Sequence, residues 1–291
     1  MRRLVLLILA LATLLPSLAQ AYDILVLQSR HDGGCEDVMN GFRSKSSVLR
    51  RLIVLSDFSE VDVVRIVRED RPQLIVAIGD AALTAARKVQ QTPVIAVMAL
   101  GVHNLKTKQQ NLTGIGMFAP PEHYIGIFRS LKAERVGIIH NPAKSGWYLQ
   151  RARQAAAAAG IELVVREVKE PKDTLNQLSS MAGKIDALWM LPDSTAVTRE
   201  TAEAYFHFGQ QQTVPVVSFA AGYLGLGAAA VVEINRIELG RQAGDMAEAI
   251  MNGNRVEGMP LGFPSGMKLK TNPTVLKNLG TLLTEHNFPL H

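Results

Sequence analysis

The stretch Arg71 to Lys88, RPQLIVAIGDAALTAARK, indicates the fold more clearly than any other part of the chain. A short apolar run, Leu74 to Ile78, stops at Gly79-Asp80, and an alanine-rich helical stretch follows at once. This order predicts a buried parallel strand, a tight turn and a helix N-terminus, the place where α/β proteins hold small ligands. A second apolar run, Ile185 to Leu191, ends in the same way at Pro192-Asp193-Ser194-Thr195. Two such ends predict two similar lobes that face one cleft.

Apolar runs alternate with helical stretches along most of the chain. The runs are made of consecutive Val, Ile, Leu and Ala, which is typical of parallel strands covered on both faces. A segment at 111–119 separates two such series. The sequence therefore predicts an α/β fold with two Rossmann-like lobes, each built on a parallel sheet, and a hinged cleft between them. The expected strands are 23–28, 51–55, 74–78 and 93–99 in the first series, and 135–140, 161–167, 185–191 and 214–219 in the second.

The first 21 residues have the three parts of a secretory signal. They are the basic start Met1-Arg2-Arg3, the apolar core Leu4 to Leu15 and the cleavage motif Ala19-Gln20-Ala21. The apolar core is too short to span a bilayer of ~30 Å comfortably, so we expect cleavage and no membrane insertion afterwards. The expected location is the periplasm. Loss of the two arginines lowers the formal net charge from +5 to +3.

Composition and motifs exclude several classes of function. Lys and Arg are scattered rather than clustered, so we expect no nucleic-acid partner. The chain has no H-E-x-x-H, no G-x-S-x-G and no phosphate-binding G-x-x-x-x-G-K-[ST]. Its seven histidines show no metal-ligand spacing on one helix. We therefore expect no enzyme, no catalytic residue, no metal and no cofactor. The single cysteine, Cys35, can form no intramolecular disulfide.

Short polar side chains follow the expected strands, and aromatic residues lie near them. Such a combination describes a small amphipathic pocket for a ligand. Asp80 and Asp193 have a second interpretation, because either carboxylate could simply cap a helix N-terminus. Both interpretations stay open at this point. The expected ligand-binding residues are Ser29, Arg30, His31, Gly79, Asp80, Ala81, Phe118, Asn141, Ser145, Asp193, Ser194, Ser218 and Phe219.

The chain contains a series of motifs: LIVAIGDAA (74–82), NLTGI (111–115), RVGIIHNP (135–142), AAAAAGIEL (155–163), GKIDAL (183–188), LPDSTAV (191–197), VPVVSF (214–219), GAAAVVEINRIELGRQAGDMAEAIMNG (227–253) and the terminal Asn278-Leu279-Gly280. In their order and spacing these motifs resemble the ABC-transporter substrate-binding family whose characterised relatives bind aromatic amino acids. The resemblance implies a type I periplasmic binding protein, with two lobes, three crossing segments and a ligand clamped by hinge closure. It implies a first lobe of 22–113 with about 221–258, and a second lobe of 114–220 with about 259–291.

Two segments depart from the family pattern. The family's Gly-Thr-Pro-Ala turn, which helps to hold the ligand carboxylate, is Gly79-Asp80-Ala81-Ala82 here. An acid at that position repels a ligand carboxylate, so we expect either that Arg30 supplies the missing cation or that the ligand is no amino acid. The usual first loop is also replaced, by Ser29 to Gly34. The turn that meets the ligand amine in relatives is retained as Asp193-Ser194.

The leading hypothesis is an exported solute-binding protein of an ABC importer. It would capture a small polar or aromatic, amino-acid-like metabolite by cleft closure, act as a monomer and deliver the ligand to a membrane permease. One alternative keeps the fold and makes the protein a periplasmic ligand-sensing subunit for a membrane sensor kinase. Another is a periplasmic enzyme in which Asp80 and Asp193 form an acid–base pair.

Overall fold

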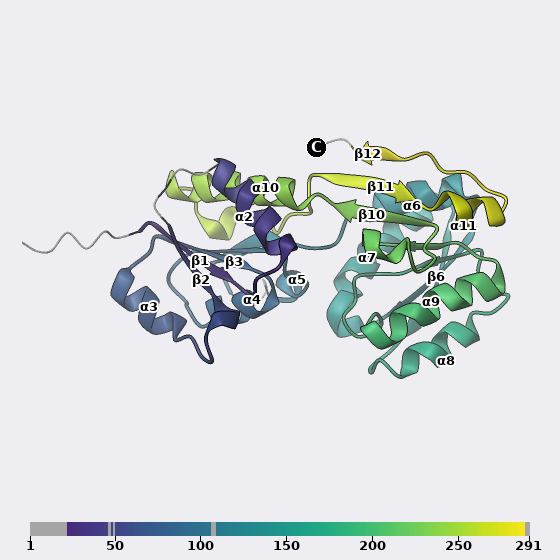
Figure 1. Ribbon diagram of the computed structural model, residues 1–291, viewed down its shortest axis with the longest axis horizontal. Helices are drawn as coiled ribbons and strands as arrows, with labels where there is room; N and C mark the ends of the chain where they lie inside the picture. The colour runs from purple at the N-terminus through teal and green to yellow at the C-terminus, as the bar shows by residue number, and fades with distance from the viewer. Residues whose placement is uncertain (1–21, 46–47, 49, 106–108, 289–291) are drawn as a thin grey trace, which may run out of the picture.

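The chain folds into two α/β lobes joined by several crossing segments (Figure 1). This computed structural model describes residues 22–45, 48, 50–105 and 109–288. The predicted signal sequence, residues 1–21, lies outside the described residues. The lobes have one parallel sheet each, as expected, although the second sheet gains an antiparallel edge.

The first lobe is built on a five-stranded, fully parallel sheet in the order β2-β1-β3-β4-β5. All five residues of β1 and of β3 are buried, because helices cover both faces. Helices α2 and α10 cover one face, and α3 and α4 cover the other. The strands are β1 (Ile24–Gln28), β2 (Arg50–Val54), β3 (Leu74–Ile78), β4 (Val94–Val97) and β5 (Leu112–Ile115), and the helices are α2 (Gly33–Lys45), α3 (Val63–Asp70), α4 (Asp80–Ala86), α5 (Val102–Leu105) and α10 (Arg236–Met251).

The second lobe has a seven-stranded sheet in the order β12-β11-β10-β9-β8-β6-β7. Its strands are parallel from β10 to β7, whereas β11 and β12 pair antiparallel. Helices α6 and α7 pack on one face, and α8 and α9 on the other. The elements are α6 (Pro121–Ser130), β6 (Arg135–His140), α7 (Pro142–Ala158), β7 (Glu162–Glu167), α8 (Asp173–Ser180), β8 (Ala187–Trp189), α9 (Arg199–Gln212), β9 (Val216–Ser218), β10 (Ala230–Ile234), β11 (Met267–Thr271), α11 (Pro273–Asn278) and β12 (His286–Phe288); the 3-10 turns are η1 (Leu55–Asp57), η3 (Ala221–Tyr223) and η4 (Val256–Gly258).

Two boundaries differ from the sequence prediction. The segment 111–119, expected as a connection only, contains β5, whose Leu-Thr-Gly-Ile sequence lacks a continuous run of large apolar residues. The stretch Ala230–Ile234, expected in the first lobe, is β10 of the second sheet. The chain therefore returns to the first lobe at Arg236, where α10 begins, and not near residue 221. The predicted bounds of β3 and β6 agree with the structure to the residue.

Three segments cross between the lobes. They run from β5 to α6, from β10 to α10, and from η4 to β11. The first and third lie side by side, since Gly116 N–H donates to the carbonyl of Gly262 and Gly262 N–H donates to that of Gly114. Among the described residues no helix is long and apolar enough to cross a membrane.

Helices α2 and α10 touch backbone to backbone, although α10 comes late in the chain (Figure 1). A methyl group on Gly240 would overlap the carbonyl oxygen of Val38, and one on Gly41 would overlap that of Ile237. Only glycine permits this approach. Next to this contact, Cys35 is 1% exposed, and burial raises the pKa of its thiol to about 11. Its thiol therefore stays protonated at neutral pH and acts as a small packing group.

We expect Gly240→Ala to lower the free energy of unfolding by about 1–3 kcal/mol, because the added methyl pushes α10 away from α2. Gly126→Ala is the matched control. That glycine also lies inside a helix, α6, but a side-chain carbon there meets nothing within 4 Å. The control should raise stability by about 0.5–1 kcal/mol through helix propensity. Thermal unfolding of both variants measures the difference, and equal effects would contradict the close contact.

Candidate functional site

A cavity of about 450 Å³ lies between the two lobes, at the carboxyl ends of their parallel strands. Parallel α/β sheets place ligand sites at this edge. The first lobe, the second lobe and the first two crossing segments contribute to the walls. The lining residues are Asp80, Met98, Leu100, Met117, Pro192, Asp193, Ser194, Val197, Thr198, Phe219, Ala220, Tyr223, Glu233, Ile234 and Arg236.

The turn between β3 and α4 brings Asp80 to the cavity. Gly79 has a φ of 89°, and a side-chain carbon on it would lie 2.6 Å from Ser29 Oγ. That hydroxyl donates to the Ile78 carbonyl (2.9 Å) and accepts the Ala82 N–H (3.0 Å). Ser29 thus joins the end of β1 to the start of α4 and does not line the cavity.

Asp80 is the first residue of α4, and the N-cap position belongs to Gly79. The carboxylate of Asp80 therefore does not cap this helix, as one sequence interpretation had it. It accepts one backbone N–H, from Gly101, at 3.3 Å, and the residue is exposed. The side chain is accordingly available to a ligand at the mouth of the cavity.

Asp193 has the opposite environment, because its carboxylate is only 1% exposed and is surrounded by donors. Its Oδ1 accepts N–H bonds from Thr195 (2.9 Å) and Ala196 (3.0 Å). Its Oδ2 accepts the Asn141 N–H (2.8 Å) and the Ser145 hydroxyl (2.6 Å). A carboxylate has about four acceptor positions, so these four donors occupy them. Asp193 ties the loop after β8 to the loop after β6. It caps no helix, since α9 begins later with Thr198 as its N-cap.

The predicted residues of the first loop lie away from the cavity. Arg30 forms an ion pair with Asp32 at 2.6 Å, and its side chain is 73% exposed. His31 contacts Asp57 at 3.0 Å on the surface. The first loop therefore contributes no group to the cavity walls.

Other predicted residues do not line the cavity but make hydrogen bonds or packing contacts near it. Asn141 caps α7 by accepting the Ala143 N–H (2.9 Å), and the hydroxyl of Ser218 donates to Met190 Sδ (3.1 Å). Phe118 is buried against Tyr148, with ring centroids 4.7 Å apart. Predicted residues that do not line the cavity are Ser29, Arg30, His31, Gly79, Ala81, Phe118, Asn141, Ser145 and Ser218, whereas Asp80, Asp193, Ser194 and Phe219 line it.

Sequence reasoning missed most of the apolar wall and one cation. Met98, in the loop after β4, has a φ of 57°, and such left-handed backbone in a non-glycine residue often marks a functional site. Phe219 and Tyr223 meet edge to face with ring centroids 5.3 Å apart. Arg236 follows the carboxyl end of β10, so the rule that selected the other strand ends would have found it too. The sequence analysis did not select Arg236 because the pattern of alternating strands and helices breaks down in that part of the chain.

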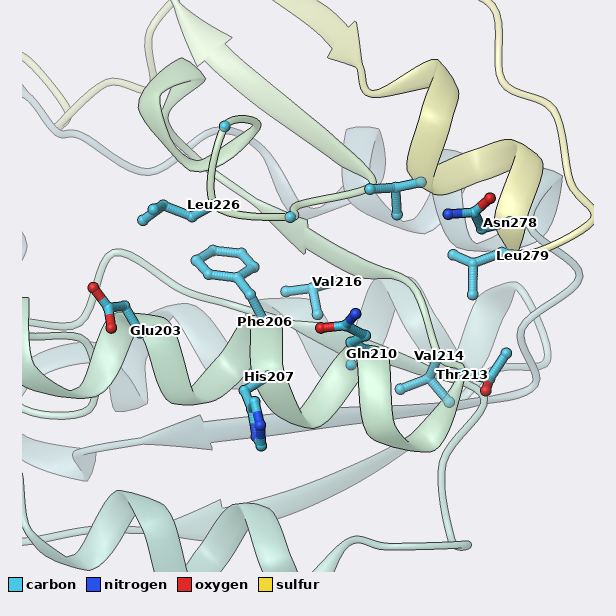
Figure 2. A pocket seen from close by; sticks show the side chains of 14 residues that line it. Glu203, Phe206, His207, Gln210, Thr213, Val214, Val216, Leu226, Asn278 and Leu279 are labelled. Carbon is cyan, nitrogen blue, oxygen red and sulfur yellow. The ribbon is translucent and has the colours of Figure 1, made fainter.

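A second cavity, of about 700 Å³, lies on the outer side of the second lobe (Figure 2). There Phe206 of α9 faces Leu226 of the glycine-rich segment, with α11 alongside. Thr213 and Val214 precede β9, so this cavity lies at the amino edge of the sheet. Because ligand sites of parallel sheets form at the carboxyl edge, the smaller cavity between the lobes is the better candidate. Across the described residues, no group of three or more His, Cys, Asp or Glu side chains could hold a metal ion.

The sequence profile for ABC transporter substrate-binding proteins matches residues 55–287. The chain belongs to this family. The family resemblance predicted from the sequence is thus confirmed, and so is the type I periplasmic-binding-protein fold.

Named relatives show how far the similarity extends. A tyrosine-binding protein of Clostridioides difficile (strain R20291) is 24% identical over 221 residues, which cover 72% of this chain and 64% of that relative. The chain thus spans less than two thirds of the relative's length. A substrate-binding protein with adhesive properties from Clostridium difficile, in a ligand-free, open structure, aligns with a TM-score of 0.70 at 20% identity, covering 90% of this chain and 96% of that one. A Streptococcus pneumoniae ABC domain in complex with L-Trp gives a TM-score of 0.63 at 20% identity, with the same coverage.

We expect Asp193→Asn to destabilise the fold by about 3 kcal/mol, because an amide cannot accept all four donors and its NH₂ group adds a clash. Ser194→Ala, at the exposed neighbouring position, is the control and should change little. Chemical denaturation measures both. A variant Asp193→Asn with unchanged stability but lost ligand binding would instead support a direct ligand contact.

The buried imidazole of His140 predicts a pH dependence of stability. Burial lowers the pKa of His140 below its usual 6.5, against an opposing effect of the Asp193 carboxylate. The unfolded chain therefore binds a proton that the folded chain does not. Above about pH 6.5 both states leave this imidazole neutral, so His140 does not reduce the free energy of unfolding. As the pH falls below 6.5, the free energy of unfolding decreases, with a slope of at most ~1.4 kcal/mol per pH unit.

In His140→Asn this part of the slope should disappear, and in a control variant of the exposed His207 it should persist. Thermal unfolding between pH 7.5 and 5 measures the slopes. Identical slopes for wild type and His140→Asn would contradict the assignment.

Proposed function

We propose that the protein is an exported solute-binding protein of an ABC importer, which captures a small amino-acid-like metabolite by closing its lobes. The observation that carries the proposal is the cavity between the lobes, whose walls come from both lobes and from two of the crossing segments. A ligand that touches both lobes favours their closed arrangement, and crossing segments absorb the movement. Binding in this picture involves no chemical step.

The export sequence at residues 1–21 supports a periplasmic location, because its basic start, apolar core and A-x-A motif match a cleaved signal. The partner that follows is the permease of the importer, which recognises the closed form. The protein acts as a monomer in this proposal. A membrane sensor kinase could recognise the same closed form, and this alternative is an outcome of the test below.

The amino-acid-like character of the ligand rests on two observations. The cavity is small and largely apolar, with the rings of Phe219 and Tyr223 in its wall and a few charged side chains, as suits a small amphipathic molecule. Two similar proteins are described as tyrosine-binding and as bound to L-Trp. The proposal therefore favours amino acids and small aromatics over sugars.

We expect at least one amino acid to raise the melting temperature in a thermal-shift screen, because a ligand at 100 times its Kd stabilises by about 2.7 kcal/mol. The matched blocking variants are Ser194→Trp, at an exposed position of the cleft, and Leu226→Trp, at a 49% exposed position of the outer cavity. The first should abolish the shift and the second should keep it. The reverse result would move the site to the outer cavity.

Small-angle scattering tests closure, since the ligand should reduce the radius of gyration. Native mass spectrometry of the purified protein identifies any bound compound. Turnover of that compound would overturn the proposal in favour of an enzyme. Ligand-dependent association with a kinase ectodomain, without transport by a reconstituted permease, would favour the sensing role.

A further inference from the structure

We propose that Arg236 holds the carboxylate of the ligand and Asp80 holds its ammonium group, so that a zwitterion with an apolar side chain lies across the cleft. This inference rests on the proposed function, because it names the ligand class and its orientation in the same cavity. It also assigns a role to Arg236, which sequence reasoning did not select.

The first argument concerns the charges that line the cavity. Four ionic side chains do so, and the charges of two of them are already compensated within the protein, whereas Asp80 accepts a single backbone N–H. The carboxylate of Asp193 accepts four hydrogen bonds, and that of Glu233 pairs with Lys270 at 2.6 Å. Asp80 and Arg236 are left. They are one anion and one cation, which is the complement of a zwitterion.

Among the described residues, Arg236 has no ion-pair partner within 4 Å, although Asp32 Oδ1 lies near it, since a side-chain carbon on Gly34 would be 3.2 Å from that oxygen. Its guanidinium makes no hydrogen bond or ion pair with any residue in the part of the chain that the structure describes. The residue is half-buried, and its side chain passes close to α2, since a side-chain carbon on Gly34 would lie 3.2 Å from Arg236 Nε. Gly34 thus leaves room for this side chain. An arginine in the first turn of a helix is also repelled by the helix dipole, so its placement is not explained by local stability.

The rest of the wall raises the cost of leaving these charges unpaired. It includes Met98, Leu100, Met117, Phe219, Tyr223 and Ile234. When lobes close and water leaves, a charge among such side chains is costly unless an opposite charge accompanies it. A ligand that brings a carboxylate to Arg236 and an ammonium to Asp80 removes both costs at once. An apolar ligand side chain then packs against the aromatic and methionine surfaces.

The charges also decide the orientation of the ligand. A carboxylate at the start of α4 would meet Asp80, whose own carboxylate repels it. The alternative cation considered from the sequence, Arg30, is paired with Asp32 and lies outside the cavity. Arg236 is instead the first residue of α10, directly after the crossing from β10, so a carboxylate bound there contacts the first lobe next to that crossing. Its guanidinium can bind the carboxylate through two parallel N–H bonds.

Isothermal titration with two ligand series tests the proposal. The aromatic series is L-phenylalanine, phenethylamine and 3-phenylpropanoate, and the aliphatic series is L-leucine, 3-methylbutylamine and 4-methylpentanoate. Wild type should bind at least one of the two amino acids, and at least tenfold more tightly than either of its singly charged analogues. Arg236→Gln should weaken the amino acid at least tenfold and leave the amine unchanged. Asp80→Asn should weaken the amino acid and leave the carboxylic acid unchanged.

Arg30→Gln is the matched control, because it removes an exposed arginine outside the cavity and should leave all affinities unchanged. Thermal unfolding without ligand checks that each variant is folded. Unchanged amino-acid affinity in Arg236→Gln overturns the inference while the proposed function stands. The same holds if wild type binds neither amino acid but another compound co-purifies in the cleft. If no small molecule binds between the lobes, the proposed function fails as well.

Discussion

The contact between α2 and α10 is the constraint on which the arrangement of the molecule depends. Gly240 and Gly41 let the two backbones meet, so a helix from late in the chain completes the first lobe. The chain must therefore leave the first lobe after β5, return for α10, and leave again for β11. Residues in or beside the first and second crossings, Met117 and Arg236 among them, line the cavity between the lobes. The same constraint places Arg236, the first residue of α10, at the cavity between the lobes.

The charged groups around the cleft have two different physical roles. Asp193 and Glu233 have partners within the protein, and their charges hold loops and strands in position. Asp80 and Arg236 have few or no partners among the described residues, so their charges are available to a ligand. A protein that binds a charged molecule benefits from such incomplete pairing, because the ligand supplies the missing charge. Electrostatic complementarity of this kind determines specificity and orientation more than total affinity.

Much of the fold could be predicted because it depends on local sequence. The apolar runs Leu74–Ile78 and Arg135–His140 are strands with the predicted bounds, and the two-lobe architecture followed from their alternation with helices. Leu112–Ile115 was missed, since the pairing of β5 with β4 comes from a neighbour in space and not from its own composition. For the candidate site, the strand-end rule found Asp80, Asp193, Ser194 and Phe219, which line the cavity. It also selected Arg30 and His31, whose surface partners Asp32 and Asp57 direct them elsewhere.

The sequence by itself determined the class of fold, the family and the edge of the sheets at which a ligand site is expected. The fold class and the sheet edge follow from the order of buried strands, because a strand covered on both faces is recognisable from its own residues. The family follows from the series of motifs along the chain. Only the tertiary structure decided which polar groups at that edge keep a free charge. That property depends on partners far apart in the chain, such as Glu233 with Lys270 or Asp193 with Ser145. Asp80, which follows Gly79, could be selected from the sequence alone. Arg236, the opposite charge at the same cavity, could be identified only from the tertiary structure.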